Sequence, residues 1–331
     1  MSDTIDPTTI APLICGFAVS GDKIEDLSWA SVSKGSAARP GERRWLHLDR
    51  RSPAAKSWLL RERSVDAFAA NALFQEDTRP RAHAHRNGLL VNLRGINLNP
   101  GAQPEDMVSL RIWVTEALVI TTQARHIRAT EDLASLFRSG EPPASNGAVI
   151  AYFAATLARR MEPVIDKLDE HADALEERLL DSGESPPKIE LSGFRRSVLQ
   201  LRRYILPQRE ALSALIREQV HLLTEDDRLS LRETQDTVIR LGEDLDTIRE
   251  RALVIQEQIV ELRAEAMNQR LFVLAIISAI FLPLGFVTGL FGVNVGGMPG
   301  VGSAAAFTFL CASLVLLTLG LLSVFKRMDW L

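Results

Sequence analysis

The short glycine-rich segment GVNVGGMPGVG, residues 292–302, has one side chain that can form hydrogen bonds, Asn294. Amide and main-chain carbonyl oxygens can hold a cation or replace part of its water shell. A dry, four-ligand zinc site would require His or Cys, and neither occurs here or in the 21 residues before it. If several copies surround an axis, Asn294 and the carbonyls of Gly292 and Val293 would form a ring that meets a hydrated ion. The alternative is that Asn294 caps a helix end.

A row of carboxylates at helical spacing is a second candidate site. Its members follow one another at steps of four, three, four and four residues and therefore share one helix face. They are Glu162, Asp166, Asp169, Asp173 and Glu177. Such a face can attract cations, although it can equally be the solvated side of an amphipathic helix.

Other patterns with chemical potential are weaker. His83 and His85 would point the same way on a strand and could share a metal ion, but Arg81 and Arg86 flank them and oppose cation binding. We therefore interpret residues 83–85 as a surface loop. No P-loop, dinucleotide fingerprint, zincin motif or nucleophile elbow occurs, so we expect neither enzymatic activity nor a resident cofactor.

The longest uncharged stretch runs from Leu271 to Phe325 and contains no Asp, Glu, Lys, Arg or His. It divides into residues 271–291 and 303–325, which as helices would extend roughly 31 and 34 Å at about 1.5 Å per residue; a bilayer core is about 30 Å thick. A hairpin inside a soluble protein would not leave 55 residues without a charge. The sequence therefore predicts two transmembrane helices.

The distribution of positive charge predicts the topology. Arg263 and Arg270 precede the first span, Lys326 and Arg327 follow the second, and the loop between the spans has neither Lys nor Arg. The positive-inside rule places both termini in the cytoplasm and the loop outside. The net charge of −4 gives no indication of nucleic-acid binding.

Apolar residues at steps of three and four predict one long helix, residues 226–291, that continues into the first span. Because two membrane helices cannot enclose a pore, a continuous apolar face suggests self-association of this helix around an axis. A dimer with a hairpin anchor and no pore is the alternative. The face comprises Leu231, Thr234, Val238, Leu241, Leu245, Ile248, Ala252, Ile255, Ile259, Leu262 and Ala266, and then Leu271, Leu274, Ser278, Leu282, Gly285, Gly289 and Gly292.

The first half of the chain predicts mixed α and β structure. Turn signals separate short strand-like runs. The runs are residues 13–19, 44–48, 88–96, 110–114 and 117–122, with helices expected near 53–72 and 130–138 and longer ones over 147–181 and 188–222.

These elements divide the chain into six parts. We expect a cytoplasmic α/β domain (1–145), a cytoplasmic helical hairpin (146–225), a stalk helix with the first span (226–291), an external loop (292–302), a second span (303–325) and a basic cytoplasmic tail (326–331).

Several strings resemble a known family. IFLPLGFVTGLFGVN, from Ile280 to Asn294, resembles the signature of the CorA superfamily of two-span metal-ion transporters. In that family the motif is usually Gly-Met-Asn; Val293 and the following GGMPG are more similar to its ZntB zinc-transporter branch. The strings LRGINLNPG and EDMVSLRIW and the tail from Lys326 to Leu331 extend the resemblance over most of the chain.

The resemblance implies a funnel-shaped homopentamer in the inner membrane of a bacterium. Its first span would line a pore for a divalent cation, zinc before magnesium, cobalt or nickel, and uptake could be proton-coupled. Gly292, Val293 and Asn294 would form the selectivity entrance. The pore-lining positions would be Leu271, Leu274, Ser278, Leu282, Gly285 and Gly289.

The loop departs from many family members because it has no acidic residue after the motif. The identity of the ion therefore stays open at this point. One alternative is a Mg²⁺/Co²⁺ channel closed by cytoplasmic divalent cations. The other is a membrane-anchored scaffold without transport.

Overall fold

The computed structural model describes residues 10–34, 38–62, 64–76, 79–182, 186–218, 221–292, 300 and 302–327. The chain forms two compact units, Met1–Gln256 and Glu257–Leu331, which are treated separately below.

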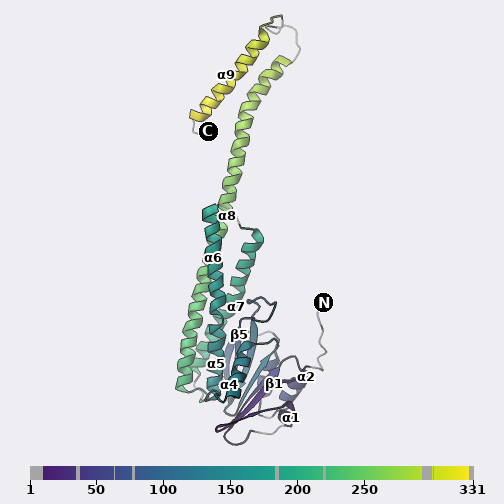
Figure 1. Ribbon diagram of the computed structural model, residues 1–331, viewed down its shortest axis with the longest axis vertical. Helices are drawn as coiled ribbons and strands as arrows, with labels where there is room; N and C mark the ends of the chain where they lie inside the picture. The colour runs from purple at the N-terminus through teal and green to yellow at the C-terminus, as the bar shows by residue number, and fades with distance from the viewer. Residues whose placement is uncertain are drawn as a thin grey trace. The chain divides into compact units, whose positions relative to one another are not determined.

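A seven-stranded mixed sheet is the centre of the first unit (Figure 1). Its order is β2-β1-β3-β7-β6-β5-β4, and β3 and β7 are parallel whereas the other neighbours are antiparallel. The strands are β1 (Leu13–Ser20), β2 (Lys23–Asp26), β3 (Glu42–Asp49), β4 (Arg81–His85), β5 (Gly88–Gly95), β6 (Val108–Val114) and β7 (Leu118–Gln123). All five predicted strand runs are strands, and the α+β class is confirmed.

Two strands were not predicted. β2 is a short, polar edge strand, and β4 is the other edge and contains His83 and His85. The interpretation of residues 83–85 as a loop is therefore wrong. Edge strands expose one side to solvent, so they need no alternating apolar pattern.

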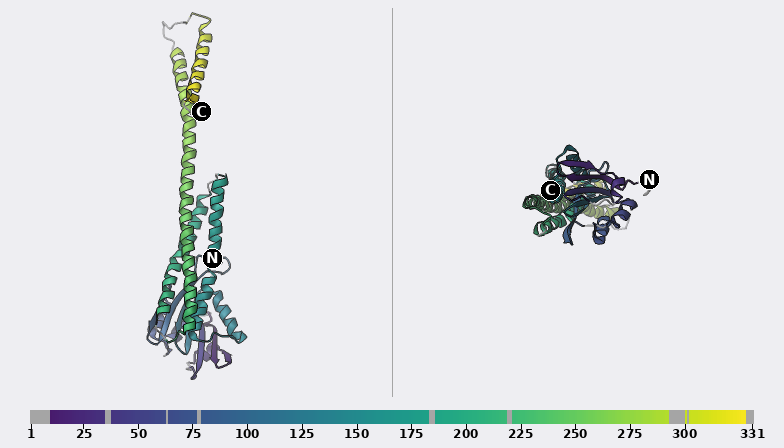
Figure 2. Two further views of the ribbon diagram at one scale, coloured as in Figure 1. Left: turned by 90° about the vertical axis from the view of Figure 1, so that its left-hand side faces the viewer. Right: turned by 90° about the horizontal axis from the view of Figure 1, so that it is seen from below.

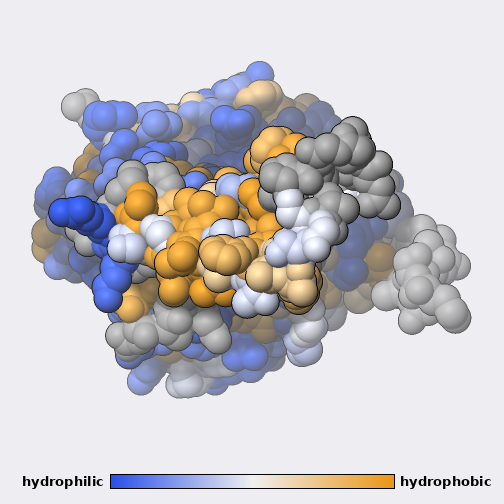
Figure 3. Space-filling model, turned by 90° about the horizontal axis from the view of Figure 1, so that it is seen from above, coloured by the Kyte–Doolittle hydropathy of each residue, from blue (hydrophilic) through white to orange (hydrophobic). Residues whose placement is uncertain are grey.

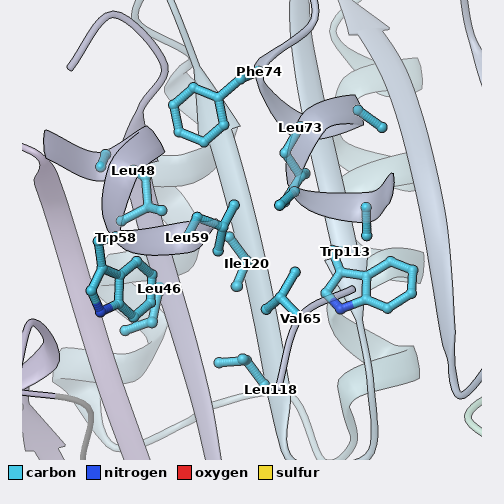
Figure 4. Packing of buried hydrophobic residues seen from close by; sticks show 14 of the residues in the cluster. Leu46, Leu48, Trp58, Leu59, Val65, Leu73, Phe74, Trp113, Leu118 and Ile120 are labelled. Carbon is cyan, nitrogen blue, oxygen red and sulfur yellow. The ribbon is translucent and has the colours of Figure 1, made fainter. Parts of the chain in front are cut away.

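One sheet face packs against three short helices, α1 (Trp29–Val32), α2 (Pro53–Leu59) and α3 (Ala67–Phe74). Alternate residues of β3, Leu46 and Leu48, lie on this face because side chains of a strand point to opposite sides in turn. Figure 4 shows them with Trp58, Leu59 and Ile120 in one buried cluster.

The opposite face carries α4 (Arg128–Ser139) and α5 (Asn146–Arg159). Trp45 of β3 packs between Phe137 of α4 and Phe153 of α5, with ring centroids 5.2 and 6.0 Å away. Helix α7 (Lys188–Arg217) runs beside β4 and β5. Its buried Gln208 accepts a hydrogen bond from the Arg94 main-chain nitrogen at 2.7 Å, which fixes α7 to β5.

The predicted helix over residues 147–181 is divided into α5 and α6 (Glu162–Ser182) by a turn at Arg160 and Met161. Pro163 explains the break, because proline has no N–H to continue the ladder and disfavours helical geometry in the residue before it. As a result α5 belongs to the sheet layer, whereas α6 lies with α7 and α8 (Figures 1 and 2).

Helix α8 runs from Glu225 to Gly292 without interruption, which confirms the single helix predicted for residues 226–291. A capping box begins it: the Asp227 nitrogen donates to Thr224 Oγ1 at 3.1 Å, and the Thr224 nitrogen donates to Asp227 Oδ2 at 3.0 Å. This box accounts for the start of the helix within one residue of the expected position.

The second unit contains the rest of α8 and the helix α9 (Ala306–Arg327). Both helices include a stretch long and apolar enough to cross a membrane, and neither stretch is buried. Figure 3 shows hydrophobic side chains gathered over the ends of these helices. Such a surface would be insoluble in water but suits a lipid environment.

Candidate functional site

In the second unit α9 turns back alongside the last part of α8 (Figures 1 and 2). Each helix has one half-buried stripe at helical spacing. On α8 these residues are Ile276, Ala279, Ile280, Pro283, Leu284 and Val287, and on α9 they are Ala306, Leu310, Leu314, Thr318 and Leu321. The two stripes are the faces through which α8 and α9 pack.

The predicted pore-lining residues occupy the other side of α8. At 100° per residue they are centred about half a turn away from the stripe that meets α9. Leu271, Leu274 and Leu282 are 56, 58 and 77% exposed, and Ser278 is also exposed. This face of α8 therefore has no covering element among the described residues of the subunit.

The small residues on that face are open as well. A Cβ atom added at Gly285, Gly289 or Gly292 would meet nothing within 4 Å. Small residues at such spacing let another helix come close in a membrane. Gly292 ends α8, whereas Val293 and Asn294 lie outside the described residues.

The earlier part of the α8 apolar face has a different role. From Leu231 to Ile259 it is buried within the subunit, with Leu245 and Ile255 fully inaccessible. Gln235 donates to Ser213 of α7 at 2.6 Å, and Arg202 of α7 pairs with Asp246. Residues 231–255 of the apolar face therefore pack within the subunit, against α6 and α7, and any self-association of α8 would have to use the exposed face further along the helix.

Arginine side chains of α8 reach part of the acidic face of α6. Arg251 bonds three carboxylates: Asp169 at 2.6 Å, Asp173 at 2.5 Å and Glu176 at 2.9 Å from Nε. The hydrogen bond to Glu176 has the largest effect of these contacts and raises the pKa of Arg251 above its usual range. A guanidinium offers five donors in a planar fork, which suits such shared binding. The negative charge at Asp169 and Asp173 is therefore partly neutralised within the subunit.

The ends of the acidic face differ from its middle. Glu162 pairs with Arg240 of α8, whereas Asp166 and Glu177 are exposed. Burial raises the pKa of Asp244 on α8, and Asp166 adds to this rise while Arg240 opposes it. The face is thus largely exposed: four of its five carboxylates are open to solvent, and three of the five pair with arginines of α8.

The arginine partners were missed at the sequence level. Arg240 and Arg251 are separated by 11 residues, about three helical turns, so they share one face of α8. That spacing beside a helix with acidic residues at the same period was the available signal.

No group of three or more His, Cys, Asp or Glu is placed to hold a metal ion in the part of the chain that the structure describes. His85 Nε2 lies 3.0 Å from Asp66 Oδ1, and both His83 and His85 pack against the Phe68 ring. These imidazoles therefore take part in the packing of β4 on α3.

An α+β unit, a bundle of long helices and a helix that continues into one of two apolar spans define the class of two-span membrane proteins. The chain matches the CorA-like Mg²⁺ transporter protein family over residues 41–327 and belongs to it. It is therefore a membrane transporter of the CorA family.

Named relatives are similar over most of their length. The chain is 37% identical to "Zinc transport protein ZntB" of Pectobacterium carotovorum over 287 residues, which cover 87% of this chain and 88% of that one. It is 39% identical to "Divalent cation transporter CmaX" of Pseudomonas aeruginosa over 294 residues, 88% and 89% of the two chains.

Solved structures agree with the fold. The full-length CmaX protein has a TM-score of 0.82 at 36% identity, covering 97% of this chain and 98% of that one. The CorA magnesium transporter of Methanocaldococcus jannaschii has a TM-score of 0.81 at 17% identity, covering 96% and 99%; at this identity the likeness concerns the fold alone.

Proposed function

We propose that this protein carries divalent cations, Zn²⁺ first among them, through a central pore formed by several copies of the chain. Family membership and the two named relatives support transport of a divalent cation. The main support for a pore is the exposed face of α8 in the span, which lies opposite the stripe that packs on α9. An exposed helix face of this kind becomes covered when several copies of the chain assemble around an axis.

In this proposal the assembly is a homopentamer with α8 as the inner helix and α9 outside. Gly292, Val293 and Asn294 form the entrance. The pathway is lined by Leu271, Leu274, Ser278, Leu282, Gly285 and Gly289. Rings of leucine would make narrow hydrophobic constrictions that gate by dewetting. The division into domains, the inner-membrane location and the cytoplasmic position of both termini belong to the same proposal.

The ion would pass with much of its water. The spans contain no ionisable residue from Leu271 to Phe325 apart from the thiol of Cys311. A proton that accompanies zinc would therefore use groups outside the spans or water in the pore. The exposed carboxylates of Asp166 and Glu177 would attract cations to the surface of α6.

A Mg²⁺/Co²⁺ channel closed by divalent cations is the second candidate, because the family description names Mg²⁺. The residues that sense the divalent cation in such a channel would have to be acidic. Arg251 and Arg240 already pair with three of the five carboxylates of the acidic face, which leaves this face poorly suited to sense a cation. This observation favours the first candidate.

Uptake into liposomes that contain the purified full-length chain tests the proposal. We expect saturable entry of Zn²⁺, reported by an internal fluorescent indicator, and a response of the rate to an imposed pH gradient if protons are coupled. Mg²⁺ entry, followed in parallel, should be much slower. Magnesium flux without zinc flux would support the channel alternative, and vesicles tight to both ions under every gradient would support a scaffold.

A further inference from the structure

The exposed faces of α6 and α7 in the first unit carry opposite charge. Carboxylates follow one another along α6 at steps of four, three and four residues, so they share one face of the helix. They are Asp166, Glu170, Asp173 and Glu177, and all four are exposed. On α7 the residues Arg196, Leu199 and Arg203 form an exposed face at steps of three and four residues. The same helical bundle therefore presents an acidic face and a basic face to its surroundings.

Most of these charges have no partner within the subunit. Neither Arg196 nor Arg203 forms an ion pair with any of the described residues. Asp166 and Glu170 are unpaired in the same sense. Leu199, which lies between the two arginines, is 51% exposed. A partner surface with negative charge would pair with the arginines and cover this leucine at the same time.

Contacts with α8 fix the heights of α6 and α7 relative to each other, measured along α8. Arg202 of α7 pairs with Asp246 of α8. Six residues earlier on α8, Arg240 pairs with Glu162 of α6. Since α6 runs in the same direction as α8 and α7 in the opposite direction (Figures 1 and 2), Arg202 is level with the part of α6 that lies six residues after Glu162.

The two charged faces therefore lie at the same height. Arg203 is level with a point on α6 one residue from Asp166, about 1.5 Å along the helix. Arg196 is level with the part of α6 between Glu170 and Glu177, within reach of either side chain. A rotation about an axis parallel to this part of α8 carries each residue into the next copy without changing its height. The carboxylates of one copy are thus level with the arginines of its neighbour.

We propose that the acidic face of α6 docks on the basic face of α7 in a second copy of the chain. Asp166 pairs with Arg203 of the neighbouring copy, and Glu170 and Glu177 lie on either side of its Arg196. This contact rests on the proposed function, because it requires several copies around one axis. Two different surfaces meet in it, and such a contact repeats from copy to copy until a ring closes.

Single surface ion pairs are weak, so the contact would act mainly by selecting which faces meet. The assembled ring would also leave fewer free carboxylates on α6 for cations than one isolated subunit has.

Cysteine cross-linking of the full-length chain in detergent tests this contact. Asp166→Cys and Arg203→Cys are combined in a chain whose exposed Cys311 is replaced by Ala. Cys15 is kept, because burial raises the pKa of its thiol to about 12. With a short bifunctional maleimide we expect a ladder of covalent species up to the full oligomer, since the two cysteines meet between different copies. Either single variant should give no ladder, and dimers from one of them would contradict the pairing.

Arg209→Cys in place of Arg203→Cys is the matched control. Arg209 is another exposed arginine of α7, six residues further along and turned about 120° away from Arg203 around the helix. Combined with Asp166→Cys it should give no ladder. An equal ladder from this control would overturn the proposal.

Charge reversal gives a second measurement. Arg203→Glu should raise the protein concentration at which the oligomer dissociates about fivefold, and the added change Asp166→Arg should restore the original value. Failure of the second change to restore the oligomer would contradict the pairing.

Light scattering of the chain before cross-linking separates this contact from the proposed function. An intact oligomer that gives no ladder would overturn the contact between α6 and α7 alone, whereas a monomer would overturn both. A ladder from a protein whose vesicles are tight to every ion would support the contact and remove transport.

Discussion

Replacing Asn294 with Ala is expected to reduce zinc flux about tenfold or more while the oligomer stays intact. Asn294 is the one hydrogen-bonding side chain in the loop of residues 292–302. In a ring of copies each amide oxygen would hold the water shell of the incoming ion, and about 1.4 kcal/mol lost at the barrier corresponds to tenfold in rate. Because no charged side chain is present in the loop, no other side chain could substitute for the ring.

The measurement is zinc uptake in liposomes at matched protein density, with the oligomer checked by light scattering. Val301→Ala is the control, since it shortens an apolar side chain of the same loop outside the proposed entrance. We expect its flux to stay near that of the wild type. Unchanged zinc flux in Asn294→Ala would remove the assigned role of the ring.

The stability of the first unit is expected to fall as the pH decreases from about 6.5 to about 4, because of His47. This side chain is completely buried beneath α4 and α5, and burial lowers its pKa from 6.5 to about 4. Its Nδ1 lies 2.7 Å from Thr121 Oγ1, which also accepts a hydrogen bond from Trp45 Nε1. The Thr121 hydroxyl thus contacts both the Trp45 indole and the His47 imidazole.

The loss of stability at lower pH follows from the difference in proton binding between the folded and unfolded chain. Between these pH values the unfolded chain takes up a proton at His47 that the folded chain refuses, so unfolding is favoured as the pH falls. A depression of about 2.5 units corresponds to roughly 3 kcal/mol at 1.36 kcal/mol per unit. Above pH 6.5 the imidazole is neutral in both states and this loss is absent.

Urea unfolding of the full chain in detergent, followed by tryptophan fluorescence at pH 7 and pH 4.5, measures the effect. His47→Gln cannot titrate and should lose markedly less stability over this interval than the wild type. His221→Gln, at an exposed histidine paired with Glu116, controls for the loss of an imidazole. The same pH dependence in His47→Gln and the wild type would contradict the assignment.

Local patterns explain why much of the fold could be predicted. Strand-like runs such as residues 110–114 are buried and apolar, and the uncharged stretch from Leu271 to Phe325 has no other common interpretation than membrane spans. The polar β4 sequence RAHAH has no such pattern, because an edge strand is specified by its partner β5. Its assignment depended on pairing, which composition does not reveal.

Periodicity identified a buried face of α8 but not its partner. Leu245 and Leu282 lie on the same predicted seam, yet α6 and α7 help to cover the first and nothing among the described residues of the subunit covers the second.

Chemical accessibility of Leu282 during transport tests the central claim that the exposed face of α8 lines the ion pathway. Leu282→Cys is prepared in a chain whose exposed Cys311 is replaced by Ala. Cys15 can stay, because burial raises the pKa of its thiol to about 12 and makes it a poor nucleophile. Ile280→Cys, two positions away and turned about 200° around the helix onto the stripe that packs on α9, is the matched control.

Zinc uptake is measured before and after addition of a small, positively charged thiol reagent. We expect the reagent to block uptake through Leu282→Cys and to leave Ile280→Cys active. Full uptake by modified Leu282→Cys, with the modification verified by mass spectrometry, would contradict it.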